Sequence, residues 1–169
     1  MKLSKPPAIS LSSKIAELSK LNILSLVLVA TFLGFYLGSN GEMEYNKLLL
    51  TLLGTALTAA GSGSLNHYLE RDADKKMDRT RNRPLPSGTL TPLFAVLYGM
   101  ALVVVGSVTL AYFVNLLTGF LSLLTAFLYI VVYTPLKKIT WLNTSIGSIP
   151  GAIPIIGGWT AASNSISPM

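Results

Sequence analysis

Long apolar stretches alternate with short charged stretches along this chain. Leu21–Gly41 and Leu48–Leu69 each contain no Asp, Glu, Lys or Arg, and Pro84–Leu136 continues without charge for 53 residues. A membrane-spanning helix takes about 20 mostly apolar residues, so the longest of these stretches has room for two. The pattern therefore predicts four spans in this part of the chain, with the turn between the third and the fourth near residues 115–119.

The last uncharged stretch predicts a fifth span, from about Leu142 to Ala162. Several glycines and two prolines, Pro150 and Pro154, interrupt its apolar pattern. Proline inside a span is tolerated where neighbouring helices or a cavity satisfy the freed backbone carbonyls. The glycine and proline pattern therefore either shapes a cavity or kinks a packed helix. The fold class predicted is all-α, a polytopic transmembrane helix bundle.

The composition agrees with a membrane protein. Hydrophobic residues make up 51% of the chain, charged residues 12%, and the mean hydropathy is +0.58. Soluble globular domains carry about 25% charged residues, so an ordinary soluble domain is excluded. The chain has no cysteine, which excludes disulfides, thiolate metal sites and cysteine nucleophiles.

The basic residues gather in three segments that the span count places on one side of the membrane. Residues 1–20 hold four, 71–83 hold six and 137–138 hold two of the 13 Lys and Arg. The positive-inside rule places this side in the cytoplasm. We therefore expect a multi-pass protein of the cell (inner) membrane with a cytoplasmic N-terminus, and the net charge of +6 requires no nucleic-acid partner.

Three regions follow from this count. Residues 1–20 are expected to form a cytoplasmic N-terminal arm, residues 21–162 the transmembrane domain, and residues 163–169 a short polar tail. The apolar run after the basic arm is longer than the 7 to 15 residues or so that a signal peptide uses, so the arm is expected to be retained.

One segment, residues 66–83, has acidic and polar residues that membrane topology alone does not require. Asn66, Glu70 and Asp74 are spaced four residues apart, which places their oxygens on one face of a helix. We expect this helix to continue to about Asn82, because no helix breaker precedes Pro84. Carboxylate and amide oxygens are the ligands that Mg²⁺ prefers, usually together with phosphate oxygens of a substrate.

Arginines follow this acidic helix end directly. Arg79, Arg81 and Arg83 are suited to phosphate contacts, because guanidinium groups bind phosphate oxygens in pairs. Carboxylates and arginines beside an apolar bundle indicate a diphosphate with a lipid tail. The alternative is a solvated helix end whose mixed charges only set the topology, and spacing alone does not decide between the two.

The motif Asn66-x-x-x-Glu70-x-x-x-Asp74, followed by Arg79-Thr80-x-x-Arg83-Pro84-Leu85, resembles the first acidic motif of the intramembrane (UbiA-type) prenyltransferases. Two later blocks agree in order and spacing with the protoheme IX farnesyltransferase (heme O synthase) branch of that superfamily. They are Tyr133-Thr-Pro-Leu-Lys137-Lys138 and the segment 140–159. The resemblance covers about residues 21–162.

This resemblance implies nine helices around a cavity and transfer of a farnesyl group from farnesyl diphosphate to a vinyl group of protoheme IX, with Mg²⁺ as cofactor. It implies Asn66, Glu70 and Asp74 as catalytic, metal-binding residues. For the substrate diphosphate it implies a basic and aromatic set: Arg79, Arg83, Tyr133 and Lys137. On spacing alone Tyr133 suits an aromatic belt at the membrane interface better, whereas Asp72 and Asp78 lie off the metal-binding face.

The family's second acidic motif is missing from this sequence. All seven acidic residues lie at or before Asp78, and only five of the nine expected spans are present. The chain is therefore an N-terminal portion of a longer protein, the interpretation that we favour, or a homo-oligomer supplies ligands in trans, or it is inactive. Functional alternatives are a prenyltransferase for a quinone precursor or chlorophyllide, and a truncated non-catalytic relative. A transporter is disfavoured, because no ionisable residue is expected at mid-membrane.

Two further features have competing interpretations. His67 is the only histidine, and one position along a helix turns it about 100° from Asn66, so packing is favoured over heme ligation. Gly61 and Gly63 favour close helix packing over contact with a ligand.

Overall fold

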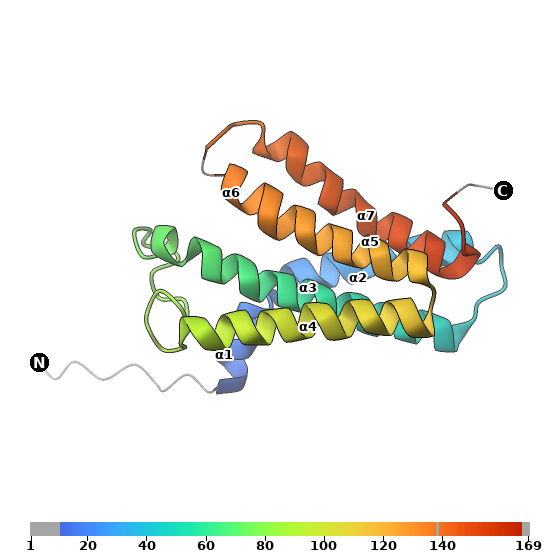
Figure 1. Cartoon of the computed structure of the whole chain (residues 1–169), viewed down its shortest axis with the longest axis horizontal. Helices are drawn as coiled ribbons and strands as arrows, with labels where there is room; N and C mark the ends of the chain where they lie inside the picture. Colours follow the sequence, from blue (N-terminus) through green and yellow to red (C-terminus); the bar gives the residue numbers. More distant parts are fainter. Residues whose placement is uncertain (1–10, 138, 167–169) are drawn as a thin grey trace, which may run out of the picture.

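The structure, a computed structural model, describes residues 11–137 and 139–166, and within those ranges it is helical, with no strand. Figure 1 shows the long helices lying alongside one another, with the short α1 (Leu11–Leu18) across one end. Lys2, Lys5 and Lys138, which contribute to the charge count, lie outside the described residues, as do residues 167–169 of the predicted polar tail.

In the part of the chain that the structure describes, four helical segments are long and apolar enough to cross a membrane, and they match the first four predicted spans. They are α2 (Leu21–Gly38), α3 (Tyr45–Asp74), α4 (Pro92–Phe113) and the segment Leu116–Leu136. The last of these is built from α5 (Leu116–Phe127), a π-helical turn, η1 (Leu128–Tyr133), and the single turn α6 (Thr134–Leu136).

The predicted fifth segment forms one continuous helix, α7 (Asn143–Ser163), with Pro150 and Pro154 inside it. It is long enough to span a membrane, but its many glycines, prolines and serines make it less apolar than the four segments above. The turn between the third and fourth spans lies at the start of the predicted range. There the Asn115 side chain accepts a hydrogen bond from the Thr118 amide at 2.7 Å and caps α5.

Small residues bring the helices into close contact. A Cβ atom on Gly61 would lie 2.5 Å from the carbonyl oxygen of Gly99, which confirms that Gly61 serves the packing of α3 against α4. The α2–α7 contact is closer still, since a Cβ on Gly158 would lie 2.0 Å from the carbonyl oxygen of Thr31. These contacts fix how α3 and α7 stand relative to their neighbours.

Large apolar side chains cover the outside of the bundle. Leu26 on α2 is 71% exposed and Leu97 on α4 is 58% exposed, which suits helices that face lipid rather than water. By contrast, α1 is attached to the bundle, because Leu18 is fully buried and forms a cluster with Leu85 and Ala95. The arm expected at residues 1–20 therefore includes a packed helix in its described part.

The connections sort to the two ends of the bundle. Figure 1 shows α1, the loop after α3 and the loop after α6 at one end, and the turns at 39–44 and 114–115 at the other. The described basic residues of the three segments predicted to share a side therefore do share one end.

Candidate functional site

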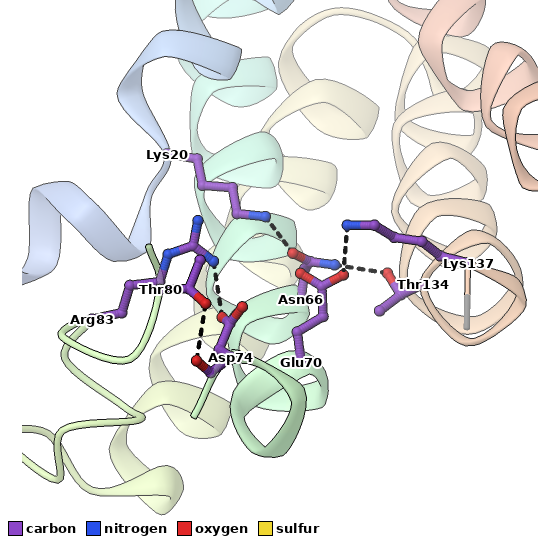
Figure 2. Close-up of polar contacts among 8 residues, drawn as sticks. All are labelled: Lys20, Asn66, Glu70, Asp74, Thr80, Arg83, Thr134 and Lys137. Carbon is purple, nitrogen blue, oxygen red and sulfur yellow. Dashed lines mark hydrogen bonds and ion pairs between the residues drawn. The ribbon is translucent and has the colours of Figure 1, made fainter. Parts of the chain in front are cut away.

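The oxygen-bearing residues of α3 lie together at the end of the bundle that carries these basic segments. Asn66, Glu70 and Asp74 occupy successive turns of α3 and are buried, with 1%, 8% and 5% of their surface exposed. We call these three residues the acidic face. The spacing argument placed them correctly on one side of the helix, and Figure 2 shows a basic side chain reaching each of them from a different segment of the chain.

Asp74 is the last residue of α3, so the expectation that the helix continues to about Asn82 is wrong. The chain turns back after Asp74 because two groups hold it there. The Thr80 hydroxyl donates to the Asp74 backbone carbonyl at 2.9 Å, and Arg83 Nη1 lies 2.8 Å from Asp74 Oδ2. Thr80 therefore satisfies a carbonyl that a longer helix would have bonded internally, and the early turn brings Arg83 back to the acidic face.

Glu70 and Asn66 are held from α6 and from the α1–α2 junction. Lys137, which follows α6, places its Nζ 3.1 Å from Glu70 Oε1. The ammonium of Lys20 donates to Asn66 Oδ1, while Asn66 Nδ2 donates to the Thr134 hydroxyl at 2.9 Å. Asn66 thus joins three segments.

The π-helical turn sets the position of Thr134. The Thr134 hydroxyl donates to the carbonyl of Tyr129, five residues earlier, at 2.7 Å. This contact leaves the hydroxyl oxygen facing Asn66. Isolated π-helical turns occur frequently at functional sites, and this one places Thr134 and Lys137 beside the acidic face.

Basic groups outnumber acidic groups around the site. Three carboxylates, Glu17, Glu70 and Asp74, share the site with four cations, Lys20, Arg79, Arg83 and Lys137. Burial lowers the pKa of Lys20 below its ordinary value, the positive charges of Arg83 and Lys137 add to this, and the negative charge of Glu70 opposes it. The excess of positive charge favours an anionic ligand.

A pocket of about 830 Å³ opens over Glu70 and Asp74 of the acidic face, and we call it the charged pocket; Asn66 does not line it. The cations Arg79, Arg83 and Lys137 line it, as predicted for residues that bind a common anion. Arg79 is exposed and makes no ion pair within the part of the chain that the structure describes. Its guanidinium is therefore available to a ligand.

The structure leaves other predicted candidates away from this pocket. Tyr133 stacks on Tyr129, with ring centroids 5.5 Å apart, and lines a different cavity. Arg81 pairs with the exposed Asp78 at 3.0 Å, and Asp72 lies on the surface beside Arg71. The sequence argument had likewise set Asp72 and Asp78 apart from the metal-binding face.

The second cavity, of about 520 Å³, lies between α2, α3, α5, η1 and α7, and we call it the apolar cavity. Pro150 and Pro154 of α7 line it, which favours the first of the two alternatives that the sequence left open, a cavity over a merely kinked helix. Cβ atoms on Gly151 and Gly157 would meet no atom within 4 Å, so these two glycines of α7 leave open space.

Sequence reasoning missed the site roles of Lys20, Thr134 and His67. Lys20 counted only toward topology, and its contact with Asn66 spans 46 positions, so no local spacing could indicate it. His67 lines the charged pocket and is 2% exposed, and neither of its ring nitrogens has a hydrogen-bond partner among the described residues. Its burial agrees with the packing interpretation, and its two ring nitrogens are buried beside the pocket.

The donor set partly fits a hard divalent cation. Within residues 11–137 and 139–166, no group of three or more His, Cys, Asp and Glu side chains is arranged to hold a metal ion. Two carboxylates lie on a single face with one amide oxygen, to which Lys20 already donates, and Mg²⁺ commonly uses one or two carboxylates and completes its shell with phosphate oxygens and water. The site therefore suits Mg²⁺ that arrives with a phosphate ligand.

Comparison with known protein families identifies the family of this chain. A model of the UbiA prenyltransferase family matches residues 27–169. The chain belongs to the UbiA prenyltransferase family. Among curated relatives, protoheme IX farnesyltransferase of Aquifex aeolicus is 45% identical over 150 residues, covering 88% of this chain and 51% of that protein. The Salinibacter ruber enzyme of the same name is 48% identical, covering 86% and 51%.

The human mitochondrial protoheme IX farnesyltransferase is 43% identical over 152 residues, covering 90% of this chain and 34% of that protein. The chain thus spans about half the length of the bacterial relatives, and less of the human one. A solved chain from a structural study of digeranylgeranylglyceryl phosphate synthase has a similar fold. Its TM-score is 0.78 at 21% identity, covering 89% of this chain and 53% of that one.

Proposed function

We propose that this chain provides the acidic face and the prenyl-diphosphate pocket of a Mg²⁺-dependent prenyltransferase that farnesylates a vinyl group of protoheme IX, giving heme O. One observation carries the proposal: a buried acidic face paired with cations from three other segments, beside an apolar cavity. The names of the relatives support the choice of farnesyl diphosphate and protoheme IX as substrates.

Binding of the diphosphate is assigned to the basic residues of the charged pocket. Arg79 has no competing ion pair among the described residues, while Arg83 and Lys137 are held by the two carboxylates in positions that face the pocket. Guanidinium and ammonium groups fixed before the substrate arrives need no reorganisation to stabilise a leaving diphosphate. His67 lines the same pocket, with both ring nitrogens buried.

The acidic face is assigned to the metal. Asn66, Glu70 and Asp74 would hold Mg²⁺ together with phosphate oxygens of the substrate. When bound, the ion supplies positive charge that offsets the negative charge developing on the leaving group.

The proposed reaction breaks the bond between C1 of the farnesyl group and its phosphate oxygen, and both electrons leave with diphosphate. The allylic cation then accepts the electron pair of the heme vinyl group and a C–C bond forms. Water adds to the new cation beside the porphyrin and releases one proton, which gives the hydroxyethylfarnesyl group. The protein's part is to hold the diphosphate with cations and to keep water from the allylic cation inside an apolar cavity.

The test begins with the reading frame at the native locus beyond codon 169, because it identifies the protein to assay. Membranes that contain the complete gene product receive labelled farnesyl diphosphate, protoheme IX and MgCl₂, and chromatography with mass detection measures heme O. We expect heme O to form with MgCl₂ and not with EDTA.

Other outcomes would change the assignment. Prenylation of a quinone precursor or of chlorophyllide in place of protoheme IX would overturn the acceptor and keep the reaction class. Binding of farnesyl diphosphate without product from any of these acceptors would identify a non-catalytic relative. Activity that requires two copies of the chain would place part of the site on a homo-oligomer partner.

A further inference from the structure

The charged pocket and the apolar cavity meet at one position in the fold. Of all the residues that line the two spaces, only Lys20 and Ile23 line both. Lys20 lies at the junction of α1 and α2, where its backbone adopts a left-handed conformation with φ of 49°. The junction therefore projects the Lys20 side chain inward between the two spaces.

Lys20 is also the one charged residue in the lining of the apolar cavity, as far as the described residues show. Its ammonium reaches Asn66 at the start of the acidic face, and Figure 2 shows the side chain extending from the α1–α2 junction across to α3. A cation at the mouth of an apolar space is expensive unless an anion accompanies it. Glu70 and Asp74 offer partial compensation, but their direct ion pairs are with Lys137 and Arg83.

A prenyl diphosphate bound across these two spaces would pass from one to the other beside Lys20 and Ile23. Its diphosphate suits the charged pocket and its hydrocarbon chain suits the apolar cavity, so the bond between C1 and oxygen must lie where the two meet. Arg79, Arg83 and Lys137 line the charged pocket alone, which places them toward the diphosphate away from C1. Lys20 is the cation nearest to the point of division.

We propose that Lys20 is a catalytic residue that binds the phosphate attached to the prenyl C1 and stabilises the oxygen released when that bond breaks. The proposal rests on the proposed prenyl transfer. The C1–O bond breaks with both electrons passing to the phosphate oxygen, and the ammonium of Lys20 stabilises the resulting negative charge while keeping its proton. The contact with Asn66 positions the ammonium before the substrate binds.

Farnesyl monophosphate isolates this contact, because it has the phosphate attached to C1 and lacks the outer one. Lys20→Gln keeps a hydrogen-bond donor near Asn66 but removes the charge, and Lys20→Arg keeps the charge. Both variants place an L-residue at the same positive φ, so any backbone strain is the same in the two. Lys76→Gln is the matched control, since Lys76 is exposed at the same end of the bundle and lines neither space.

The measurement is equilibrium binding of farnesyl monophosphate, farnesyl diphosphate and farnesol to the complete gene product in detergent, with turnover measured in parallel. We expect Lys20→Gln to weaken farnesyl monophosphate binding about 10- to 100-fold, as loss of one charged hydrogen bond predicts, and to leave farnesol binding unchanged. Arg79→Gln should weaken the diphosphate and spare the monophosphate. Lys20→Arg should restore most of the monophosphate affinity, and Lys76→Gln should match the wild type.

The possible failures are distinguishable. If Lys20→Gln binds farnesyl monophosphate and turns over as the wild type does, the role of Lys20 is overturned and the prenyl transfer stands. If the variant loses monophosphate and farnesol equally, Lys20 only supports the cavity and the proposal is also overturned. If the wild-type protein binds no farnesyl diphosphate, the proposed function itself fails.

Discussion

Lys137 and Glu70 are 67 positions apart in the sequence, yet Lys137 Nζ lies 3.1 Å from Glu70 Oε1. The carboxylate is largely buried and the ammonium is about half exposed, so the pair joins the end of α3 to the end of α6 at the rim of the charged pocket. An exposed ammonium adds little stability by such pairing. The ion pair matters because it holds the Lys137 ammonium where a diphosphate would bind.

The carboxylate of Asp74 is expected to be required for turnover. Asp74→Asn keeps the shape of the side chain but removes the charge that holds Arg83 and would bind the metal. We expect heme O formation by the complete gene product to fall by about 100-fold or more, with membrane insertion unchanged. Asp78→Asn is the control, because Asp78 is exposed and its one ion pair among the described residues is with Arg81. Near-normal product formation by Asp74→Asn would refute the metal assignment.

The guanidinium of Arg83 is expected to matter for more than its charge. Arg83→Lys keeps the charge and loses the planar group that binds two oxygens at once. We expect the dissociation constant of farnesyl diphosphate to rise about 10-fold, measured by equilibrium binding in detergent. Arg81→Lys makes the same change on the surface and should have no effect. Equal affinities of the two variants would count against a diphosphate contact by Arg83.

The sequence predicted the spans and the acidic face because both depend on local spacing. Asn66, Glu70 and Asp74 share a helix face as soon as α3 forms, and the apolar runs are long enough to be recognised without an alignment. The end of α3 was predicted wrongly at Asn82. That helix stops at Asp74 because Thr80 bonds the Asp74 carbonyl, a turn contact that helix propensity does not contain.

The partners of the acidic face could not be predicted from spacing. Lys20 and Thr134 reach Asn66 across 46 and 68 positions, so only the packed bundle brings them together. The apolar pattern of residues 128–133 does not distinguish a π-helical turn from an α-helix. The turn that positions Thr134 could therefore not be predicted. Of the two residues that the family resemblance assigned to the diphosphate in this part of the chain, Lys137 lines the charged pocket and Tyr133 lines the apolar cavity.

On the α7 side, the contact between α2 and α7 is expected to depend on Gly158 and not on its neighbour Gly157. A Cβ on Gly158 would lie 2.0 Å from the Thr31 carbonyl, and one on Gly157 would meet no atom within 4 Å. Gly158→Ala should therefore destabilise the protein by about 1 to 3 kcal/mol through overpacking. Gly157→Ala should be neutral or slightly stabilising, because alanine favours helix. Thermal unfolding in detergent measures both, and equal stability of the two variants would contradict the packing described.

The orientation in the membrane is a prediction that single cysteines can test, because the chain has none of its own. Ser87 and Glu42 are exposed, and they belong to the loop after α3 and the turn at 39–44, which lie at opposite ends of the bundle (Figure 1). With the basic end in the cytoplasm, an impermeant maleimide applied from outside should label Glu42→Cys and leave Ser87→Cys unlabelled until the membrane is opened. The reverse pattern would invert the topology.

The central claim is that the charged pocket binds a prenyl diphosphate together with Mg²⁺, and one binding experiment tests it most directly. The complete gene product in detergent is titrated with farnesyl diphosphate in MgCl₂ and again in EDTA, with Asp74→Asn beside the wild type. We expect saturable binding that weakens at least about 10-fold in EDTA, is displaced by inorganic diphosphate, and is lost in Asp74→Asn. Equal binding in MgCl₂ and EDTA, or binding that inorganic diphosphate does not displace, would contradict the account.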